Sequence, residues 1–279
     1  MFKFSLILAT YGRKAEIERF LQSLVVQELD SSEFEIIIVD QNDKIQLESL
    51  VRKYENKLNI KHLKIKEKGL SLARNKGLEI SSGEIIAFPD DDCEYYPSTL
   101  SIVANKFCND HSIDILLGKI VDKDGNNIIR NWSSMEFAIS IFNFYTNLSS
   151  ITIFIKITGF SFDEDFGVGA KYGSCEDVDL IFSFLKEKNR LIYYPDVIVY
   201  HPDQGVDNID IQKISKYGIG FGAFCRKHIG LLTLNMFISI VAYHFLKLII
   251  SLIKVDFKNV IKRWSYIKSR IKGFATYER

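Results

Sequence analysis

The stretch Glu84-Ile85-Ile86-Ala87-Phe88-Pro89-Asp90-Asp91-Asp92 decides how this 279-residue chain is interpreted. Its apolar half is typical of a short buried strand, and three adjacent carboxylates follow it. Adjacent carboxylates repel one another, and an opposite charge nearby favours their ionised forms. Mg²⁺ and Mn²⁺ take oxygen ligands and often join one or two carboxylates to substrate phosphates. The stretch therefore predicts a metal and phosphate platform, and a solvated acidic turn is the simpler alternative.

Strands and helices alternate along the chain up to and beyond this stretch. Such alternation predicts right-handed crossovers and a largely parallel sheet. Ligands bind such sheets beyond the carboxyl ends of the strands, where Thr10 and Tyr11, Asp40 and the aspartate triplet all fall. We expect buried strands at 4–9, 35–39, 60–65 and 85–88, and helices at 13–29, 47–58, 70–80 and 98–107.

The pattern changes after about residue 112, where the strands are separated by mixed loops. We expect a catalytic domain over 1–215, with a nucleotide-sugar half at 1–110 and an acceptor half at 111–215. A helical region, apolar and then basic, is expected over 216–279. Within the acceptor half we predict strands at 113–121, 151–157 and 191–200, a glycine-rich loop at 167–174 and a helix at 178–187.

The composition is that of a folded protein with a basic end. Apolar residues make up 47% and charged residues 25%, which excludes a disordered chain. The net charge of +1 conceals an asymmetry, because residues 254–279 contain eight Lys or Arg against two Asp or Glu. A basic end on a mildly acidic body predicts contact with a polyanionic surface.

The cysteines and the first strand exclude several classes of protein. None of the four cysteines forms a Cys-x-x-Cys pair, so we expect no structural zinc and a reducing compartment. The apolar run at 4–9 meets Arg13 and Lys14 too soon to be a secretory signal. The first strand leads into Thr10-Tyr11-Gly12-Arg13, which matches neither a dinucleotide fingerprint nor a phosphate-binding loop of the P-loop type.

Two charged residues near the other strand ends are candidates for nucleotide binding. Asp40 can accept the N3–H of a uracil or thymine ring, or it can cap the turn after its strand. Arg74 lies on the helix that leads towards the aspartate strand, and its guanidinium can pair with phosphate. A surface salt bridge is the alternative for Arg74.

The acceptor half supplies candidates for a base and for a further metal ligand. Glu176 and Asp177 open the helix after the glycine-rich loop, where a helix N-terminus favours ionised carboxylates. Asp177 can act as a general base, or it can form a capping box with Ser174. His201 follows the strand at 191–200 and can serve as a metal ligand, although a lone histidine is more often structural.

These segments, taken together and in this order, resemble the family 2 glycosyltransferases of the GT-A fold, an α/β fold with a Rossmann-like, mostly parallel sheet flanked by helices. The likeness extends over about residues 4–201. The stretch from Phe162-Asp163-Glu164 to Gly173 is similar to bacterial enzymes that build capsule or O-antigen polysaccharides. Two positions depart from the family pattern: Ser183 lies where an arginine is often found, and Cys93 lies where a further aspartate is often found.

The resemblance implies a role for each candidate residue. Asp177, with Glu176 beside it, is the expected catalytic base, and Asp90 and Asp92 form the D-x-D motif. Asp92 is the expected direct ligand of Mn²⁺ or Mg²⁺, with Asp90 and His201 as further ligands. The residues implied to bind the nucleotide sugar are Thr10, Tyr11, Arg13, Asp40, Arg74, Asp90 and Asp91.

The resemblance also implies the reaction and its partners. Asp177 removes a proton from the acceptor hydroxyl as that oxygen attacks the anomeric carbon of a UDP-sugar, and one displacement inverts the anomeric centre. The metal acts as a Lewis acid on the departing diphosphate. The expected acceptor is a glycan or a lipid-linked oligosaccharide, at the cytoplasmic face of the plasma membrane.

The apolar stretch at 230–253 is long enough to cross a bilayer, which needs about 20 apolar residues. A single span would place the basic end outside the cell, against the positive-inside rule. We therefore expect helices that lie on the cytoplasmic leaflet, with Lys and Arg near anionic lipid. A re-entrant hairpin, a helical subdomain on the catalytic body and an oligomer interface are the alternatives. Nucleic acid is not expected as a partner, because no base-reading motif accompanies the basic end.

Two other functions compete with a transferase. A catalytically silent scaffold that binds nucleotide sugars would bind UDP without turnover, but the intact D-x-D pair and acidic pair argue against it. A nucleotidyltransferase would need a loop rich in glycine and lysine after the first strand, and residues 8–13 supply none.

Overall fold

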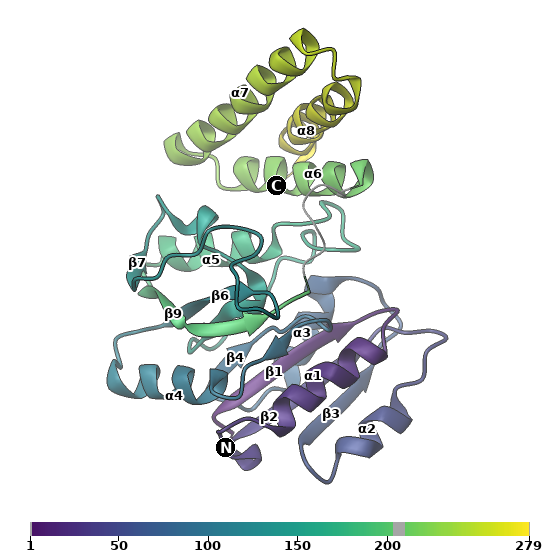
Figure 1. The fold of residues 1–279 in the computed structure, drawn as a ribbon, viewed down its shortest axis with the longest axis vertical. Helices are drawn as coiled ribbons and strands as arrows, with labels where there is room; N and C mark the ends of the chain where they lie inside the picture. Colours follow the sequence, from purple (N-terminus) through teal and green to yellow (C-terminus); the bar gives the residue numbers. More distant parts are fainter. Residues whose placement is uncertain (1, 203–209, 279) are drawn as a thin grey trace. The chain divides into compact units, whose positions relative to one another are not determined.

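The protein is described by a computed structural model that covers residues 2–202 and 210–278 and forms two compact units (Figure 1). The first unit contains residues 2–162 and 180–202, and the second contains 163–179 and 210–278. Helix α5 (Glu176–Lys186) begins in the second unit and continues into the first. The segment 163–179, expected in the acceptor half, thus groups with the C-terminal helices. Arg279, the last cation of the basic end, lies outside the described residues.

The first unit is built on a mixed sheet with the strand order β3-β2-β1-β4-β8-β6-β9-β5, and β7 pairs with β9. Strands β1 to β4 are parallel, and β6 and β9 are parallel to each other, whereas β8, β5 and β7 run antiparallel to their neighbours. The strands are β1 (Phe4–Thr10), β2 (Phe34–Asp40), β3 (Asn59–Lys64), β4 (Ile85–Ala87), β5 (Glu94–Tyr95), β6 (Ile115–Val121), β7 (Phe137–Ile139), β8 (Ile153–Ile155) and β9 (Leu191–Tyr200).

Helices cover both faces of the parallel part of the sheet (Figure 1). The strand order reverses direction at β1, so right-handed crossovers place α1 and α2 on one face and α3 on the other. Phe20 lies on an apolar face of α1 that is fully buried. The helices of this unit are α1 (Ala15–Val25), α2 (Glu48–Tyr54), α3 (Leu70–Ile80) and α4 (Thr99–Asn109), with short 3-10 turns at Ser31–Glu33, Phe144–Thr146 and Ser150–Thr152.

The register of the parallel strands brings their polar ends together. Thr10 of β1 lies opposite Asp40 of β2, so both side chains come from the carboxyl edge of the sheet. Helix α3 packs closely on β1, since a Cβ on Gly77 would lie 2.3 Å from the Cγ2 of Ile7. Arg74 lies one turn earlier on the same helix, and its side chain reaches Asp90 of the aspartate triplet.

The α/β architecture and most of the expected elements are confirmed. Helix α3 and strand β9 have the expected bounds, and β1, β2 and β6 are within two residues of theirs. The strand expected at 151–157 is shorter, because residues 150–152 form a 3-10 turn ahead of β8. Strands β5 and β7 were not expected. They contain two and three residues, too few for an alternating pattern to be read.

The second unit is a helical bundle of α6 (Ile211–Lys227), α7 (Leu231–Ile253) and α8 (Phe257–Thr276). Small residues bring α6 and α8 into close contact. A Cβ on Gly222 would lie 2.1 Å from the carbonyl oxygen of Arg270, and one on Gly273 would lie 2.0 Å from that of Ile219. Helix α8 is therefore locked to α6 by backbone contact, and substitution at either glycine would push the helices apart.

Helix α7 packs along α8 through ring contacts. The rings of Phe237 and Phe274 are 4.5 Å apart, and those of His244 and Tyr266 stack at 4.4 Å. Among the described residues, α7 is the one helix that is long and apolar enough to cross a membrane. Its most apolar window has a mean hydropathy of 2.1, and only 11% of that window is buried.

Candidate metal and nucleotide site

The aspartate triplet forms a tight turn directly after β4. The N–H of Cys93 donates to the carbonyl oxygen of Asp90 at 3.3 Å, which closes the turn. Asp91 and Asp92 are buried, whereas the side chain of Asp90 is 39% exposed. Each of the three carboxylates of the turn has its own partners. The simpler interpretation, a solvated acidic turn, does not fit two buried carboxylates.

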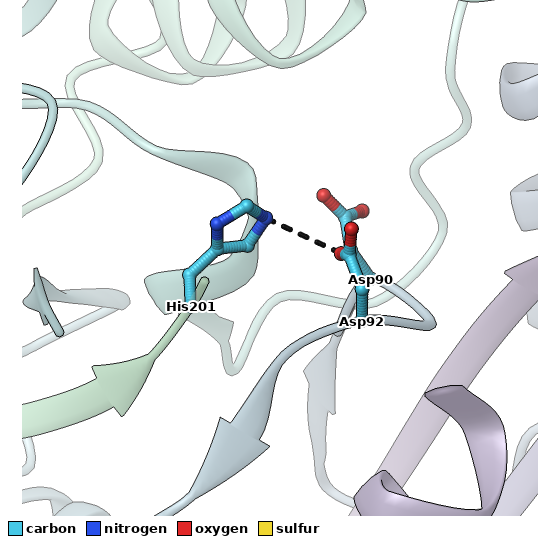
Figure 2. Close-up of side chains that lie close together, drawn as sticks. All are labelled: Asp90, Asp92 and His201. Carbon is cyan, nitrogen blue, oxygen red and sulfur yellow. Dashed lines mark ion pairs between the residues drawn. The ribbon is translucent and has the colours of Figure 1, made fainter. Parts of the chain in front are cut away.

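Asp90, Asp92 and His201 converge on one point in the first unit (Figure 2). One ligand atom from each side chain lies within 4.8 Å of the other two, and the Nε2 of His201 is 3.2 Å from the Oδ1 of Asp92. The backbone N–H of His201 donates to Val121 at 3.1 Å, which fixes the residue at the end of β9. Its Nδ1 lies 2.9 Å from the carbonyl oxygen of Pro202, so the ring presents Nε2 to the carboxylates.

This donor set fits a divalent cation. Carboxylate oxygens are the ligands of Mg²⁺ and Mn²⁺, and an imidazole nitrogen is a common additional ligand for transition metals such as Mn²⁺. The hydrogen bond of Nδ1 to a backbone carbonyl is the second contact that orients a metal-binding histidine. Asp90, Asp92 and His201 are therefore the residues that could hold the ion.

The charges at this point already favour an ionised Asp92. Burial works against ionisation of Asp92, but the hydrogen bond and charge of His201, together with Arg13, lower its pKa to about 2. For His201, burial disfavours the imidazolium, and the hydrogen bond and charge of Asp92 outweigh it, so its pKa is raised. A proton on His201 thus occupies the position that a cation would take.

Asp91 connects the triplet to β1 and to the turn that follows it. The hydroxyl of Thr10 donates to its Oδ2 at 2.7 Å, and Arg13 donates from Nη1 to its Oδ1 at 2.8 Å. Burial raises the pKa of Asp91 to about 6, although both partners act in the opposite direction. The Arg13 guanidinium also pairs with Asp92. Thr10, Arg13 and Asp91 therefore hold the turn in place, and their contact with a nucleotide stays a prediction.

Tyr11 is exposed and Arg74 is buried. Tyr11 is 61% exposed, and the Nζ of Lys68 lies 4.9 Å from its ring centre. Arg74 lies against the rings of Phe88 and Phe162, and its Nη2 is 3.4 Å from the Oδ1 of Asp90. The alternative of a surface salt bridge is wrong for Arg74, because only 2% of the residue is exposed. Arg74 therefore forms a partly buried ion pair with Asp90.

Asp40 is enclosed at the end of β2. Its Oδ1 accepts from the backbone and side-chain nitrogens of Asn42, both at 2.8 Å, and its Oδ2 lies 3.0 Å from the Nε2 of His62 on β3. The turn-capping role considered from the sequence is present. Oδ1 already accepts two hydrogen bonds, so a base would have to use the remaining lone pair of Oδ2, and Asp40 is fully buried. His62 was missed as a partner, because it is 22 residues away and only the β2–β3 register brings it close.

Glu176 and Asp177 form the first turn of α5 in the second unit. The helix begins at Glu176, and the carbonyl oxygen of Cys175 accepts from the N–H of Asp179 at 2.9 Å. The hydroxyl of Ser174 lies 3.4 Å from two carbonyl oxygens of α6, and the N–H of Val178 donates to the Oδ1 of Asp177 at 2.8 Å. Whether Asp177 caps the helix or acts as a base stays a prediction. Cys175 has a φ of 70°, a rare conformation for a non-glycine residue, directly before the acidic pair.

A partly buried ion cluster around Asp179 was not expected from the sequence. The Nζ of Lys227 lies 2.7 Å from Asp163 and 2.7 Å from Asp179, and the Nε2 of His228 is 2.7 Å from Asp179. These contacts tie both ends of the 163–179 segment to the end of α6. Sequence separations of 48 or more residues gave no local signal for them.

Comparison with known proteins identifies the family of this chain. The model of glycosyl transferase family 2 matches residues 5–164. The chain belongs to that family. The matched range contains β1, Asp40, Arg74 and the whole aspartate triplet, and it ends just before the loop that leads to α5.

Two relatives are transferases of bacterial glycans. The chain is 35% identical over 130 residues to the poly(ribitol-phosphate) β-N-acetylglucosaminyltransferase TarS of Staphylococcus aureus, across 46% of this chain and 22% of TarS. It is 29% identical over 127 residues to the GalNAc(5)-diNAcBac-PP-undecaprenol β-1,3-glucosyltransferase of Campylobacter jejuni, across 44% of this chain and 40% of that protein. The match thus spans well under half of either relative.

Solved structures of two relatives confirm the GT-A fold. TarS residues 1–349 in complex with UDP-GlcNAc align with a TM-score of 0.61 at 18% identity, over 99% of this chain and 92% of that one. The mannosyltransferase PcManGT of Pyrobaculum calidifontis, in complex with GDP-Man and Mn²⁺, aligns with a TM-score of 0.63 at 16% identity, over 98% and 86%. At these identities the likeness concerns the fold.

Binding of Mn²⁺ should weaken as the pH falls through the raised pKa of His201. Below that pKa the imidazolium must lose a proton before it can bind a cation, so the affinity should fall by up to about tenfold per pH unit. Calorimetric titration of the full chain with Mn²⁺ between pH 5.5 and 8 measures this, and His201→Gln should bind more weakly with a flatter pH profile. Equal pH profiles for the two proteins would exclude His201 as a ligand.

Proposed function

We propose that this protein is an inverting, metal-dependent glycosyltransferase that moves a sugar from a UDP-sugar to a hydroxyl group of a glycan acceptor. The observation that carries the proposal is the convergence of Asp90, Asp92 and His201 at the carboxyl end of the sheet of a family 2 chain. A buried carboxylate paired with an imidazole is a costly arrangement for a surface turn, and a cation site gives it a purpose.

The donor is a nucleoside diphosphate sugar, and we propose a UDP-sugar. The TarS structures with UDP and UDP-GlcNAc support this choice, because TarS is also among the matching sequences. Asp40 accepts the N3–H of the uracil, with Asn42 and His62 holding its carboxylate. Tyr11, exposed beside Lys68, and Arg13 are the further donor contacts on the β1 side.

Asp90, Asp92 and His201 would hold Mn²⁺ or Mg²⁺. When bound, the cation would supply charge neutralisation for the departing UDP. Arg74 pairs with Asp90, and Thr10 and Arg13 hold the turn through Asp91. These contacts fix the positions of the ligand atoms.

Asp177 takes the proton from the acceptor hydroxyl as that oxygen attacks the anomeric carbon. Its place in the first turn of α5 favours the ionised carboxylate that a base requires. Glu176 beside it adds negative charge at the same helix terminus. The bond from the anomeric carbon to the UDP oxygen breaks on the opposite face, so a single displacement inverts the centre and no carboxylate nucleophile is needed.

The acceptor is a lipid-linked glycan in the biosynthesis of a cell-surface polysaccharide, such as a capsule or an O-antigen. The name of the Campylobacter jejuni relative includes undecaprenol, which supports a lipid-linked acceptor here. The cytoplasmic face of the plasma membrane is the proposed site of action, because nucleotide sugars are made in the cytoplasm. The apolar and largely uncovered α7 is consistent with contact to that surface.

Two substitutions test the proposal with radiolabelled UDP-sugars. Asp177→Asn should lower kcat by about 10²–10⁴-fold, because it removes the base, and should leave UDP affinity unchanged. Asp92→Ala should abolish Mn²⁺-dependent donor binding and turnover. Transfer to a glycan acceptor and donor hydrolysis are the measurements, over glucose, galactose and their N-acetyl and uronic forms. UDP binding without turnover for any donor would instead favour a silent scaffold protein.

Asp40→Asn should distinguish recognition of the uracil ring from a purely structural role of Asp40. If Asp40 accepts the uracil N3–H, the substitution should weaken UDP binding by about tenfold or more, the scale of a lost hydrogen bond to a charged group. Binding of CDP, whose ring has no N3–H, should change little. Calorimetry with both nucleotides measures this. Equal losses for UDP and CDP would show that Asp40 serves only the turn and His62.

A further inference from the structure

Helix α7 buries polar side chains within the second unit and exposes mainly apolar ones. Its three buried residues, Thr233, His244 and Ser251, are all polar. Most of the side chains that point away from the bundle are large and apolar: Leu231 is 90% exposed, and Leu246 and Ile253 are 60% and 76% exposed. Asn235, Ser239 and Lys247 are exposed among them. A helix on the surface of a soluble bundle has the opposite arrangement, so the outer face of α7 favours an apolar medium.

The buried polar side chains of α7 are satisfied inside the bundle. The hydroxyl of Thr233 lies 2.8 Å from the carbonyl oxygen of His228, and that of Ser251 lies 2.9 Å from the carbonyl oxygen of Lys247. His244 stacks on Tyr266 and lies 3.4 Å from the Nη1 of Arg263. The buried polar side chains are thus satisfied by the turn before α7, by α7 itself and by α8, and the mainly apolar face is left as the outer surface.

Helix α8 combines exposed apolar residues with lysines on one arc. The side chains of Phe257, Ile261, Trp264 and Ile271 are each at least half exposed and recur at helical spacing. Lys258, Lys268 and Lys272 are exposed between them. Trp and Lys interleaved with aliphatic side chains are typical of helices at the boundary between lipid head groups and acyl chains, where the lysine stems extend to the head groups.

The same packing argues against α7 as a single membrane span. Helix α8 lies along α7 from the Phe237–Phe274 contact to the His244–Tyr266 contact, and it is locked to α6 through Gly222 and Gly273. A bilayer around α7 would also take in the cations of α8, among them Arg263 beside His244. Charged side chains are strongly disfavoured in the hydrocarbon core. The hairpin therefore lies in the boundary region.

We propose that the α7–α8 hairpin inserts its outward face into the head-group region of an anionic lipid bilayer as a monotopic anchor. The hairpin end exposes Ile253, Val255 and Phe257, interleaved with the exposed Lys254 and Lys258. The lysines of α8 pair with anionic head groups. The biological reason for this anchor rests on the proposed function, since it would bring the transferase to a lipid-linked acceptor.

Charge favours lipid over a second copy of the chain as the occupant. A symmetric dimer through this face would bring the same patch of both copies together, so the α8 lysines of one copy would approach those of the other. Like charges at an interface oppose association. An anionic bilayer complements these lysines and covers the apolar side chains at the same time.

Flotation of the full chain with liposomes tests the anchor. Wild-type protein should float with vesicles of phosphatidylcholine and phosphatidylglycerol, and less with phosphatidylcholine alone or at high salt. Leu246→Asp/Ile253→Asp should lower the bound fraction at least tenfold. The matched control, Val26→Asp/Met135→Asp, adds the same charge at apolar side chains of the first unit that are 58% and 73% exposed, and it should float like the wild type.

Several outcomes would overturn the anchor. These are wild-type protein that stays unbound with anionic vesicles, and Leu246→Asp/Ile253→Asp floating as well as wild type. Light scattering adds a third: a wild-type dimer that this variant makes monomeric, with neither protein floating, would assign the face to a protein interface. UDP calorimetry on each variant shows that it is folded. Flotation without turnover would support the anchor and count against the transferase, and turnover without flotation would do the reverse.

Labelling of the C-terminal end separates an anchor from a span. In a Cys108→Ser background, which removes the exposed native thiol, Glu278→Cys should react with a membrane-impermeant maleimide after the protein binds to the outside of sealed vesicles. A hairpin in the outer boundary region leaves residue 278 on the side of addition. Protection of this cysteine until the vesicles are opened would show that α7 crosses the bilayer and would overturn the proposal.

Discussion

The first unit depends on how the charge of the aspartate triplet is compensated after β4. Each carboxylate has a cationic partner: Asp90 pairs with Arg74, Asp91 with Arg13, and Asp92 with both Arg13 and His201. These partners come from α3, from the turn after β1 and from the end of β9. The triplet therefore joins three parts of the unit, and the repulsion among its members is offset by distant residues. A cation bound to Asp90 and Asp92 would complete the same compensation.

This constraint explains which parts of the site could be predicted from the sequence. The strand ends at Thr10, Asp40 and Asp90 follow from local apolar runs, and a parallel sheet must bring such ends to one edge. The convergence of His201 with the triplet was implied by the family resemblance. Strand β5 carries Glu94 opposite Tyr200 of β9 and so brings His201 near Asp92, but its two residues are too few to be recognised in a sequence.

Other contacts could not be predicted, because they depend on long-range register and packing. His62 reaches Asp40 only through the pairing of β2 with β3. Arg74 is buried against two aromatic rings, whereas its helix taken alone suggested a surface position. The Lys227 cluster ties the 163–179 segment to α6, and α7 turns its polar side chains inward. Periodicity reports that a helix is apolar, but not which of its faces is covered.

The central claim is that Asp90, Asp92 and His201 hold a divalent cation that receives the diphosphate of a UDP-sugar. The most direct measurement is anomalous diffraction from crystals of the full chain grown with Mn²⁺ and UDP. We predict a manganese peak bounded by these three side chains, with the UDP diphosphate as its remaining ligand. A manganese peak held by other residues, or UDP bound with no manganese between these side chains, would contradict the claim.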